Sequence, residues 1–397
     1  MDNVEEKVIP MNRRFLLIPV LAALLGLGPL VMHAGELQAQ IEYPEQRTRA
    51  GHVWDRDIPR YLSTLGMRQY EAHPATQDPA RLVTAEDTRR WEEELSNWGR
   101  WGDDDTRGAL NMITPQKALE AIALVEEGRT VNLMHMAEFH PSVDGWRFWP
   151  GEKWLTSVNP ETGEVGTGAA LDAIRFSTHD GTLSHLDAIC HYDRRPPLAD
   201  IDPDYRVTYN NHRHPRTELS CQGDVGVMGM GEGYVTRAVL VDMPLMKRVE
   251  WLEPSTPIFI EDLEAWEEFA GVTIGEGDAL LIRTGRWAKR EAEGPWKYDQ
   301  GGAGLHASVL PWLRERDVSL LVGDAVTDVQ PSGVEGFGRP VHTISMVAMG
   351  LPLVDNGYLE DVAATAREFQ RWEFMLSWLI NQSDGGTAVP FSGVATF

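Results

Sequence analysis

Short apolar runs bounded by glycine or charged residues recur along the chain. The runs at 129–134, 237–243, 278–285 and 318–324 have the length and aliphatic content expected of strands. Segments with apolar residues at helical spacing alternate with the later runs, at 260–271, 305–316 and 359–372. This alternation of strands and helices predicts a mixed α/β domain, and no internal repeat is evident.

A further helix is predicted ahead of the first strand. Thr114 and Pro115 are a favourable N-cap and first helical residue, and Gly128 is a favourable stop. In this helix, Leu119, Ile122 and either Leu124 or Val125 are expected to face the core.

The later helix at 260–271 places Leu263, Trp266 and Phe269 on one side, where they are expected to pack together. Gly271 is its expected stop.

The first residues have the pattern of a secretory signal. Arg13 and Arg14 precede an apolar run at 15–32, and cleavage is expected before Gln40, with cleavage after Ala34 as the alternative. Proline and glycine interrupt the run, which favours a signal peptide over an uncleaved membrane anchor. We therefore expect residues 1–39 to direct export to the periplasm or to the outside of the cell.

Two further parts of the chain are expected after the signal. Residues 40–94 are polar and predict an extended N-terminal arm, and residues 95–397 predict one catalytic domain. Within that domain, residues 141–170 are rich in glycine, proline and tryptophan. They are either a loop that covers an active site or a surface insertion.

Composition narrows the possible partners. The chain has 36 lysines and arginines against 60 aspartates and glutamates, a net charge of −24. This charge argues against a nucleic-acid partner and against an anionic membrane surface. There are only 2 cysteines, Cys190 and Cys221, which we expect to be structural thiols, with a single bridge as the alternative.

Candidate chemistry is concentrated in the segment HDGTLSHLDAICH at 179–191. Of the 12 histidines, 5 lie between 179 and 214. His185 and Asp187 are two residues apart, so in an extended segment their side chains share a face, and a turn would bring His191 to the same side. Imidazole and carboxylate suit zinc or manganese, and an open position on such an ion would activate water.

The segment resembles the H-x-G-T-H-x-D-x-x-x-H signature of the cyclase-like metal hydrolases, which include kynurenine formamidase and isatin hydrolase. The longer members of that family are the most similar. Further matching blocks lie at 98–115, 277–287, 303–313, 321–333 and 340–356.

This resemblance implies a swivelling β/β/α-type fold, with a small mixed β-barrel surrounded by helices, usually as a homodimer. It implies one or two divalent ions, zinc or manganese. The implied ligands here are His185, Asp187, His342 and Asp355, and the implied role of His191 is that of a proton shuttle or a further ligand. The chain departs from the signature at Gly181, where the first histidine is expected, and we expect His179 to take that role.

The expected function is hydrolysis of a cyclic amide, imide, formamide or lactone by metal-activated water. Trp146, Trp149 and Phe176 are candidates for holding a flat substrate. The alternatives are a metal-dependent cyclase or dehydratase, and an exported ligand-binding protein whose metal site is structural or degenerate.

Other polar residues are expected to have structural roles. His212 and His214 are expected in a loop, and His306 in the structural interior. Asp324 and Asp328 lie at the end of an expected strand, where they either contact a ligand or cap a turn.

Overall fold

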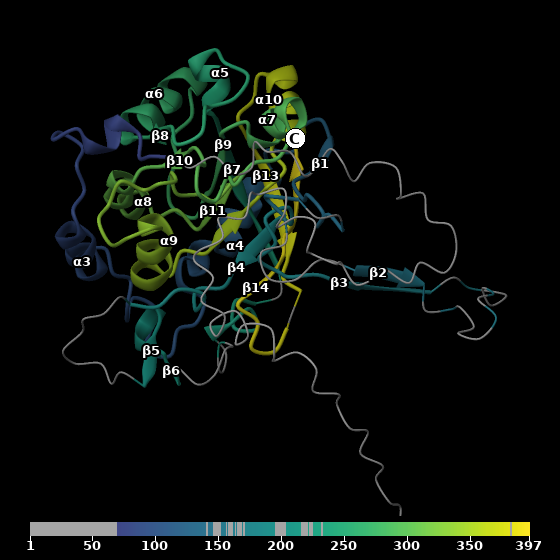
Figure 1. The fold of residues 1–397 in the computed structure, drawn as a ribbon, viewed down its shortest axis with the longest axis horizontal. Coiled ribbons are helices and arrows are strands. Elements are labelled where there is room, and N and C mark those ends of the chain that lie inside the picture. Colours follow the sequence, from purple (N-terminus) through teal and green to yellow (C-terminus); the bar gives the residue numbers. More distant parts are fainter. Residues whose placement is uncertain are drawn as a thin grey trace, which may run out of the picture. The chain divides into compact units, whose positions relative to one another are not determined.

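A nine-stranded mixed sheet, curled into a half-barrel and surrounded by helices, forms the centre of the fold (Figure 1). The computed structural model describes residues 70–397 apart from 140–141, 146–151, 156, 158–161, 163, 165–168, 170, 195–203, 216–220, 222–224, 232 and 382. The predicted signal peptide and most of the predicted arm lie outside these residues. None of the described helices is long and apolar enough to cross a membrane.

Four adjacent parallel strands lie at the middle of the sheet: β7 (Gly233–Asp242), β9 (Ala279–Arg283), β11 (Leu320–Gly323) and β12 (Leu353–Asp355). The first three match the predicted apolar runs, and every residue of β9 and β11 is buried. Parallel strands covered on both faces are continuously apolar, which is why the sequence shows them clearly.

Antiparallel strands extend this parallel block on both sides. On one side lie β13 (Glu373–Leu379), β15 (Ser392–Thr396) and β1 (Thr130–Asn132). On the other side lie β4 (His185–Asp187) and β14 (Ala388–Pro390). Outside the sheet, short strands pair as β2 (Glu152–Leu155) with β3 (Asp172–Arg175), β5 (Tyr205–Val207) with β6 (Arg213–Pro215), and β8 (Pro257–Ile258) with β10 (Gly304–Leu305).

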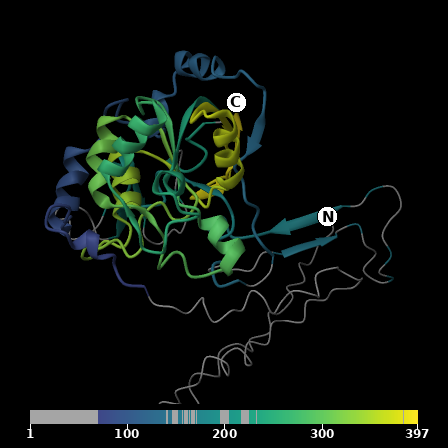
Figure 2. The same cartoon turned by 90° about the horizontal axis from the view of Figure 1, so that it is seen from above.

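Helices pack around the sheet, as the two views in Figures 1 and 2 show. They are α3 (Ala85–Glu94), α4 (Pro115–Ile122), α5 (Met243–Lys247), α6 (Ile260–Ala270), α7 (Arg286–Glu293), α8 (Leu310–Glu315), α9 (Pro340–Ile344) and α10 (Glu360–Phe369). Shorter helical turns are η3 (Pro74–Gln77), η4 (Gly108–Met112), η5 (Tyr209–Asn211), η7 (Ala307–Val309) and the π-helical turn η8 (Ser345–Met349).

The predicted mixed α/β class is confirmed. Within the predicted arm, however, the described residues form η3 and α3 instead of an extended chain. Trp91 of α3 and the flanking Val83 and Leu95 belong to the hydrophobic core. This part of the segment is therefore packed onto the domain.

In two helices, the side chains that face the core differ from those predicted. In α4, Leu119 and Ile122 are 61% and 51% exposed, and Ala121 is the buried residue. Lys117 instead anchors this helix through an ion pair with the buried Asp278 at 2.5 Å. The apolar spacing was therefore a poor guide, because a charged residue fixes which side of α4 faces the domain.

In α6, Leu263 and Trp266 are fully buried as predicted, whereas Phe269 is 57% exposed. The Phe269 ring covers the edge of the core by packing on Trp266 and Trp372, at centroid distances of 5.3 and 6.2 Å.

The buried imidazole of His306 is expected to make folding stability depend on pH. Its Nδ1 accepts a hydrogen bond from the Ser308 backbone at 3.2 Å, and its ring lies 5.0 Å from the Phe259 ring. Burial, aided by the charge of Arg81, lowers the pKa of His306 to about 4 from 6.5. Between pH 6.5 and 4 the unfolded chain therefore binds a proton that the folded chain does not. Stability should fall by up to about 3 kcal/mol over that range as the pH is lowered.

The measurement is urea unfolding of the wild type and of His306→Asn at several pH values. The asparagine oxygen can keep the bond to the Ser308 backbone but does not titrate. A shallower pH dependence is expected in the variant, and an unchanged profile would contradict the role of His306.

Candidate metal centre

The short strand β4 brings His185 and Asp187 to one face at the middle of the chain's histidine-rich segment. Because β4 is extended, these two side chains point the same way. On one side β4 pairs antiparallel with β12, and the register sets His185 opposite Asp355. Directly opposed residues of an antiparallel pair share a face, so Asp355 joins the same group.

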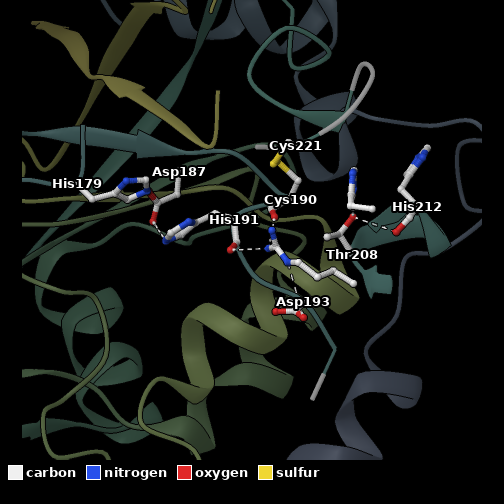
Figure 3. Close-up of a disulfide and its surroundings, with 10 residues drawn as sticks. His179, Asp187, Cys190, His191, Asp193, Thr208, His212 and Cys221 are labelled. Atoms are coloured by element: carbon white, nitrogen blue, oxygen red, sulfur yellow. Dashed lines mark hydrogen bonds and ion pairs between the residues drawn. A yellow bond between two sulfur atoms is a disulfide. The ribbon is translucent and has the colours of Figure 1, made fainter. Parts of the chain in front are cut away.

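Asp187 lies at the centre of this group. Its carboxylate oxygens lie 3.3 Å from His179 Nε2, 3.5 Å from His185 Nε2 and 3.9 Å from His191 Nε2. Figure 3 shows His179 and His191 on either side of the carboxylate. The structure therefore brings together all of the ligand candidates from the histidine-rich segment.

His342 reaches the same centre from α9. Its Nε2 lies 3.9 Å from an Asp187 oxygen and 3.3 Å from an Asp355 oxygen. On its other side, Nδ1 contacts Asp328 at 2.5 Å, and the same carboxylate accepts from the Val341 backbone at 2.6 Å. Asp328 thus caps α9 and aims His342, the kind of outer contact that orients metal-binding histidines.

The donor set fits a divalent cation. Ligand atoms of His179, Asp187 and His191 lie within 4.8 Å of one another, and so do those of His185, Asp187 and Asp355. His179 Nε2 and one Asp187 oxygen are buried without a hydrogen-bond partner among the described residues. A cation between these atoms would satisfy both, because carboxylate oxygens and unprotonated imidazole nitrogens are metal ligands.

The charges of the centre also favour a cation. Burial opposes the charged form of Asp187, but His191, His185 and His179 outweigh it and lower the pKa of Asp187. Burial likewise opposes the charged form of His342, yet Asp355 and the other groups around it raise the pKa of His342 well above its usual value. In the metal-free chain, a proton on His342 therefore supplies positive charge that a cation could supply instead.

His191 behaves differently from His342. It is only half-buried by neighbouring side chains, and its ring stacks on that of His179 at 4.2 Å. Burial, together with the charges of other histidines, outweighs the effect of Asp187 and lowers the pKa of His191 to about 4. A neutral imidazole at the edge of the centre can accept a proton at pH 7.

The family model for cyclases matches residues 131–328, a range that includes β4 and Asp328. The match to the cyclase family therefore spans just under half of the chain. A crystal structure described as a novel cyclase is 23% identical, covers 77% of this chain and 99% of that chain, and has a TM-score of 0.63, which shows the same fold. The comparison with curated proteins gives no match.

Two isatin hydrolases are less similar to this chain. Isatin hydrolase A from Ralstonia solanacearum is 19% identical, covers 71% of this chain and 97% of that chain, and has a TM-score of 0.44. An isatin hydrolase bound to the product analogue thioisatinate is 15% identical, covers 71% and 98% respectively, and has a TM-score of 0.46.

The departure from the cyclase signature at Gly181 has a structural explanation. His179, Gly181 and Thr182 keep the order of the signature, and two extra residues, Leu183 and Ser184, separate them from His185. A Cβ atom at Gly181 would lie 1.8 Å from the Asp144 backbone oxygen, so no side chain fits there in this loop conformation. His179 instead approaches Asp187.

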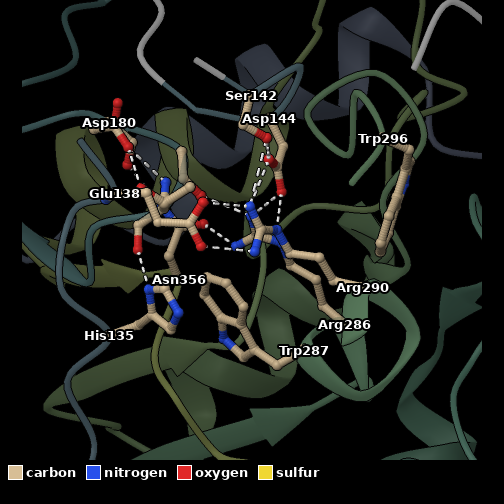
Figure 4. A network of polar contacts seen from close by, with 12 residues as sticks. His135, Glu138, Ser142, Asp144, Asp180, Arg286, Trp287, Arg290, Trp296 and Asn356 are labelled. Carbon is tan, nitrogen blue, oxygen red and sulfur yellow. Dashed lines mark hydrogen bonds and ion pairs between the residues drawn. The ribbon is translucent and has the colours of Figure 1, made fainter. Parts of the chain in front are cut away.

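Beside the centre, a buried group of charges connects its two halves (Figure 4). Arg286 donates to the Gly181 backbone oxygen at 2.7 Å and to the Asn356 side-chain oxygen at 2.8 Å. It also pairs with Asp144 at 3.2 Å. Because Asn356 follows Asp355, one arginine supports both the histidine-rich segment and the segment that carries a distant ligand.

Sequence reasoning did not identify this role of Arg286. Arg286 directly follows the expected strand 278–285, and nothing in the local pattern shows which carboxylate an arginine will meet.

The remaining candidates lie in different places. Trp146 and Trp149 are outside the described residues, and Phe176 is half-buried just after β3. His212 contacts the Asp105 backbone at 3.1 Å, and His214 contacts Thr208 at 3.2 Å, so both belong to the β5–β6 region instead of the centre.

Asp324 and His306 have structural roles. Asp324 accepts from the Thr284 and Gly285 backbones, both at 2.8 Å, and so caps the turn before α7. His306 is fully buried against Phe259, as expected for a structural residue.

Cys190 and Cys221 form a disulfide, contrary to the prediction of two thiols (Figure 3). Their Cα atoms lie 6.0 Å apart and both residues are buried. Their spacing in the sequence could not reveal this proximity. The bond ties Cys221 to the residue immediately before His191.

Replacing both cysteines with serine is expected to lower the free energy of unfolding by about 3–4 kcal/mol, because the bond closes a loop with a sequence separation of 31. The measurement is guanidinium unfolding of the double variant, with oxidised and reduced wild type as references. The reduced wild type should resemble the variant. A variant as stable as the oxidised wild type would contradict the prediction.

Proposed function

We propose that this protein is a metal-dependent hydrolase that cleaves a carbon–nitrogen bond of a cyclic amide, imide or formamide, or the ester bond of a lactone. The observation that carries the proposal is a pair of three-residue ligand groups that share Asp187, one completed by His179 and His191, the other by His185 and Asp355. The chain's resemblance to the cyclase-like metal hydrolases supports the same class.

In this proposal, the ligand groups hold one or two ions of zinc or manganese. His185, Asp187 and Asp355 form the more buried set, with His342 beside it. His179 and Asp187 belong to the more exposed set. A bound divalent ion polarises the substrate carbonyl and lowers the pKa of water.

The protein's own groups supply proton transfer and orientation. His191 is not bound to an ion in this proposal and is neutral at pH 7, so it can take a proton from the attacking water and return it to the leaving nitrogen or oxygen. Asp328 holds the buried imidazole of His342 in position. The Leu183 backbone oxygen, 2.9 Å from His185 Nδ1, does the same for His185. Phe176, with Trp146 and Trp149, is proposed to contact a flat substrate.

We also propose that the protein is exported to the periplasm or secreted, and that it acts as a homodimer. The Cys190–Cys221 disulfide supports export, because disulfides persist in oxidising compartments. Cell fractionation tests the location, and light scattering of the purified protein tests the oligomeric state.

The decisive experiment is metal analysis of the purified protein combined with a turnover screen. The screen covers N-formylkynurenine, isatin, cyclic imides and lactones, with and without added zinc or manganese. One or two equivalents of metal with hydrolysis of a tested compound are expected. Metal-free protein that stays inactive after both additions would overturn the proposal. Ring closure or dehydration without hydrolysis would favour a cyclase or dehydratase.

A further inference from the structure

Arg339 is a cation that lies beside the candidate metal centre. Its guanidinium has no carboxylate partner within 4.0 Å among the described residues. By contrast, the buried Arg283 and Arg286 each pair with carboxylates at 2.6 to 3.2 Å. The Arg339 side chain donates a hydrogen bond to the Tyr192 hydroxyl at 3.5 Å. Since a guanidinium carries five N–H donors, most of those on Arg339 remain available.

Tyr192 places that guanidinium on one side of the centre. The Tyr192 ring lies 4.9 Å from the His191 ring and 5.4 Å from the His342 ring. Its hydroxyl contacts Arg339, which directly precedes α9, the helix that carries His342. A ligand that reaches His191 and His342 is therefore close to the free donors of Arg339.

The surroundings keep this arginine charged. Although burial opposes the charge, Tyr192, Asp355 and Asp328 outweigh it and raise the pKa of Arg339. These acidic groups are also committed elsewhere, because Asp328 caps α9 and contacts His342, while Asp355 contacts His342 and Thr327. None of them offers Arg339 the forked pairing that a guanidinium makes with a carboxylate.

We propose that Arg339, positioned by Tyr192, binds a carboxylate group of the ligand. The substrate class is then a carbonyl compound that either carries a carboxylate or yields one when its ring is opened by water. This inference rests on the proposed function, because it concerns the ligand of the same centre.

The first test measures binding instead of turnover. Benzoate and its neutral isostere benzamide are titrated by calorimetry into the metal-loaded full-length protein, and the metal content is measured in every sample. The variants are Arg339→Gln, Arg339→Lys and Arg316→Gln. Arg316 is a half-buried arginine that pairs with Glu267 at 2.9 Å and serves as the matched control.

Arg339→Gln is expected to weaken benzoate binding roughly 10- to 100-fold and to change benzamide binding less than about threefold, since a charged hydrogen-bonded pair is lost. Arg339→Lys keeps the charge without the fork, so an intermediate loss is expected. Arg316→Gln should match the wild type. If both Arg339 variants hold wild-type levels of metal and bind benzoate as tightly as the wild type, the proposal is overturned.

A second comparison identifies the source of the carboxylate. N-formylanthranilate and formanilide differ by one carboxylate, and both are formamides. A KM that rises in Arg339→Gln only for N-formylanthranilate points to the substrate's carboxylate. Weaker product inhibition by isatinate, with both KM values unchanged, points to the carboxylate formed on ring opening.

The experiments distinguish failure of the proposed reaction from failure of the proposed anion site. If no carbonyl compound is hydrolysed but benzoate binding still depends on Arg339, the proposed reaction fails and the anion site stands. If hydrolysis occurs and neither benzoate binding, KM nor product inhibition responds to Arg339, the reaction stands and the anion site fails.

Discussion

Replacing Asp187 with asparagine is expected to abolish metal binding and to reduce hydrolysis on the order of a thousandfold or more. Asp187 is 1% exposed, and it is shared by both candidate ligand groups. An amide has nearly the same shape but lacks the negative charge that offsets a divalent cation. Removing this one charge should therefore weaken both groups together.

Thermal unfolding provides a second measurement. A ligand that binds the folded state raises its stability, so zinc or manganese should raise the Tm of the wild type. The same addition should leave the Tm of Asp187→Asn unchanged. The metal-free variant should remain folded, because its asparagine avoids a buried charge.

Asp172→Asn is the matched control, since Asp172 is a half-exposed carboxylate of β3 that pairs with Lys153. It should keep wild-type metal content and turnover. Full metal occupancy in Asp187→Asn would contradict the assignment of Asp187 as the shared ligand.

Replacing Arg286 with methionine is expected to destabilise the metal-free fold by about 3–5 kcal/mol, because it leaves the buried carboxylate of Asp144 with less compensation. The side chains of Arg286 and Asp144 are 1% and 0% exposed. The variant also loses the bonds to Gly181 and Asn356. Urea unfolding in the presence of a chelator measures this effect.

A separate effect on metal affinity is expected, about 10- to 100-fold, as for other groups that orient metal ligands. A metal titration of the folded variant measures it. Lys153→Met is the control, because this lysine forms an exposed ion pair whose loss should cost less than about 1 kcal/mol. An Arg286→Met protein with wild-type stability and metal affinity would show that the cluster does not support the centre.

The parts of the fold that were predictable are those where burial leaves a local pattern. β7, β9 and β11 were visible because strands covered on both faces are apolar at successive positions. The exposed Leu119 of α4 was not predictable, because the ion pair of Lys117 with a distant aspartate sets the orientation of that helix. A single helical period does not contain that information.

The candidate site likewise contains residues that the sequence predicted and residues that it did not. His185 and Asp187 were expected to act together because strand geometry joins residues two apart. Asp355 and His342 entered only through the family resemblance, since a register between distant strands has no local signal. Arg339 was missed altogether, because its significance is the lack of a carboxylate partner among the described residues, which only the folded structure reveals.

The position of β4 also sets the order in which the centre can be made. Its hydrogen-bonded neighbours are β12 at 353–355 and β14 at 388–390, both far downstream of residues 185–187. A nascent chain that has emerged from the ribosome only to residue 350 possesses all 12 histidines but neither neighbouring strand. The candidate ligand set is therefore incomplete until synthesis has passed Asp355, and β4 gains its second neighbouring strand only after residue 390.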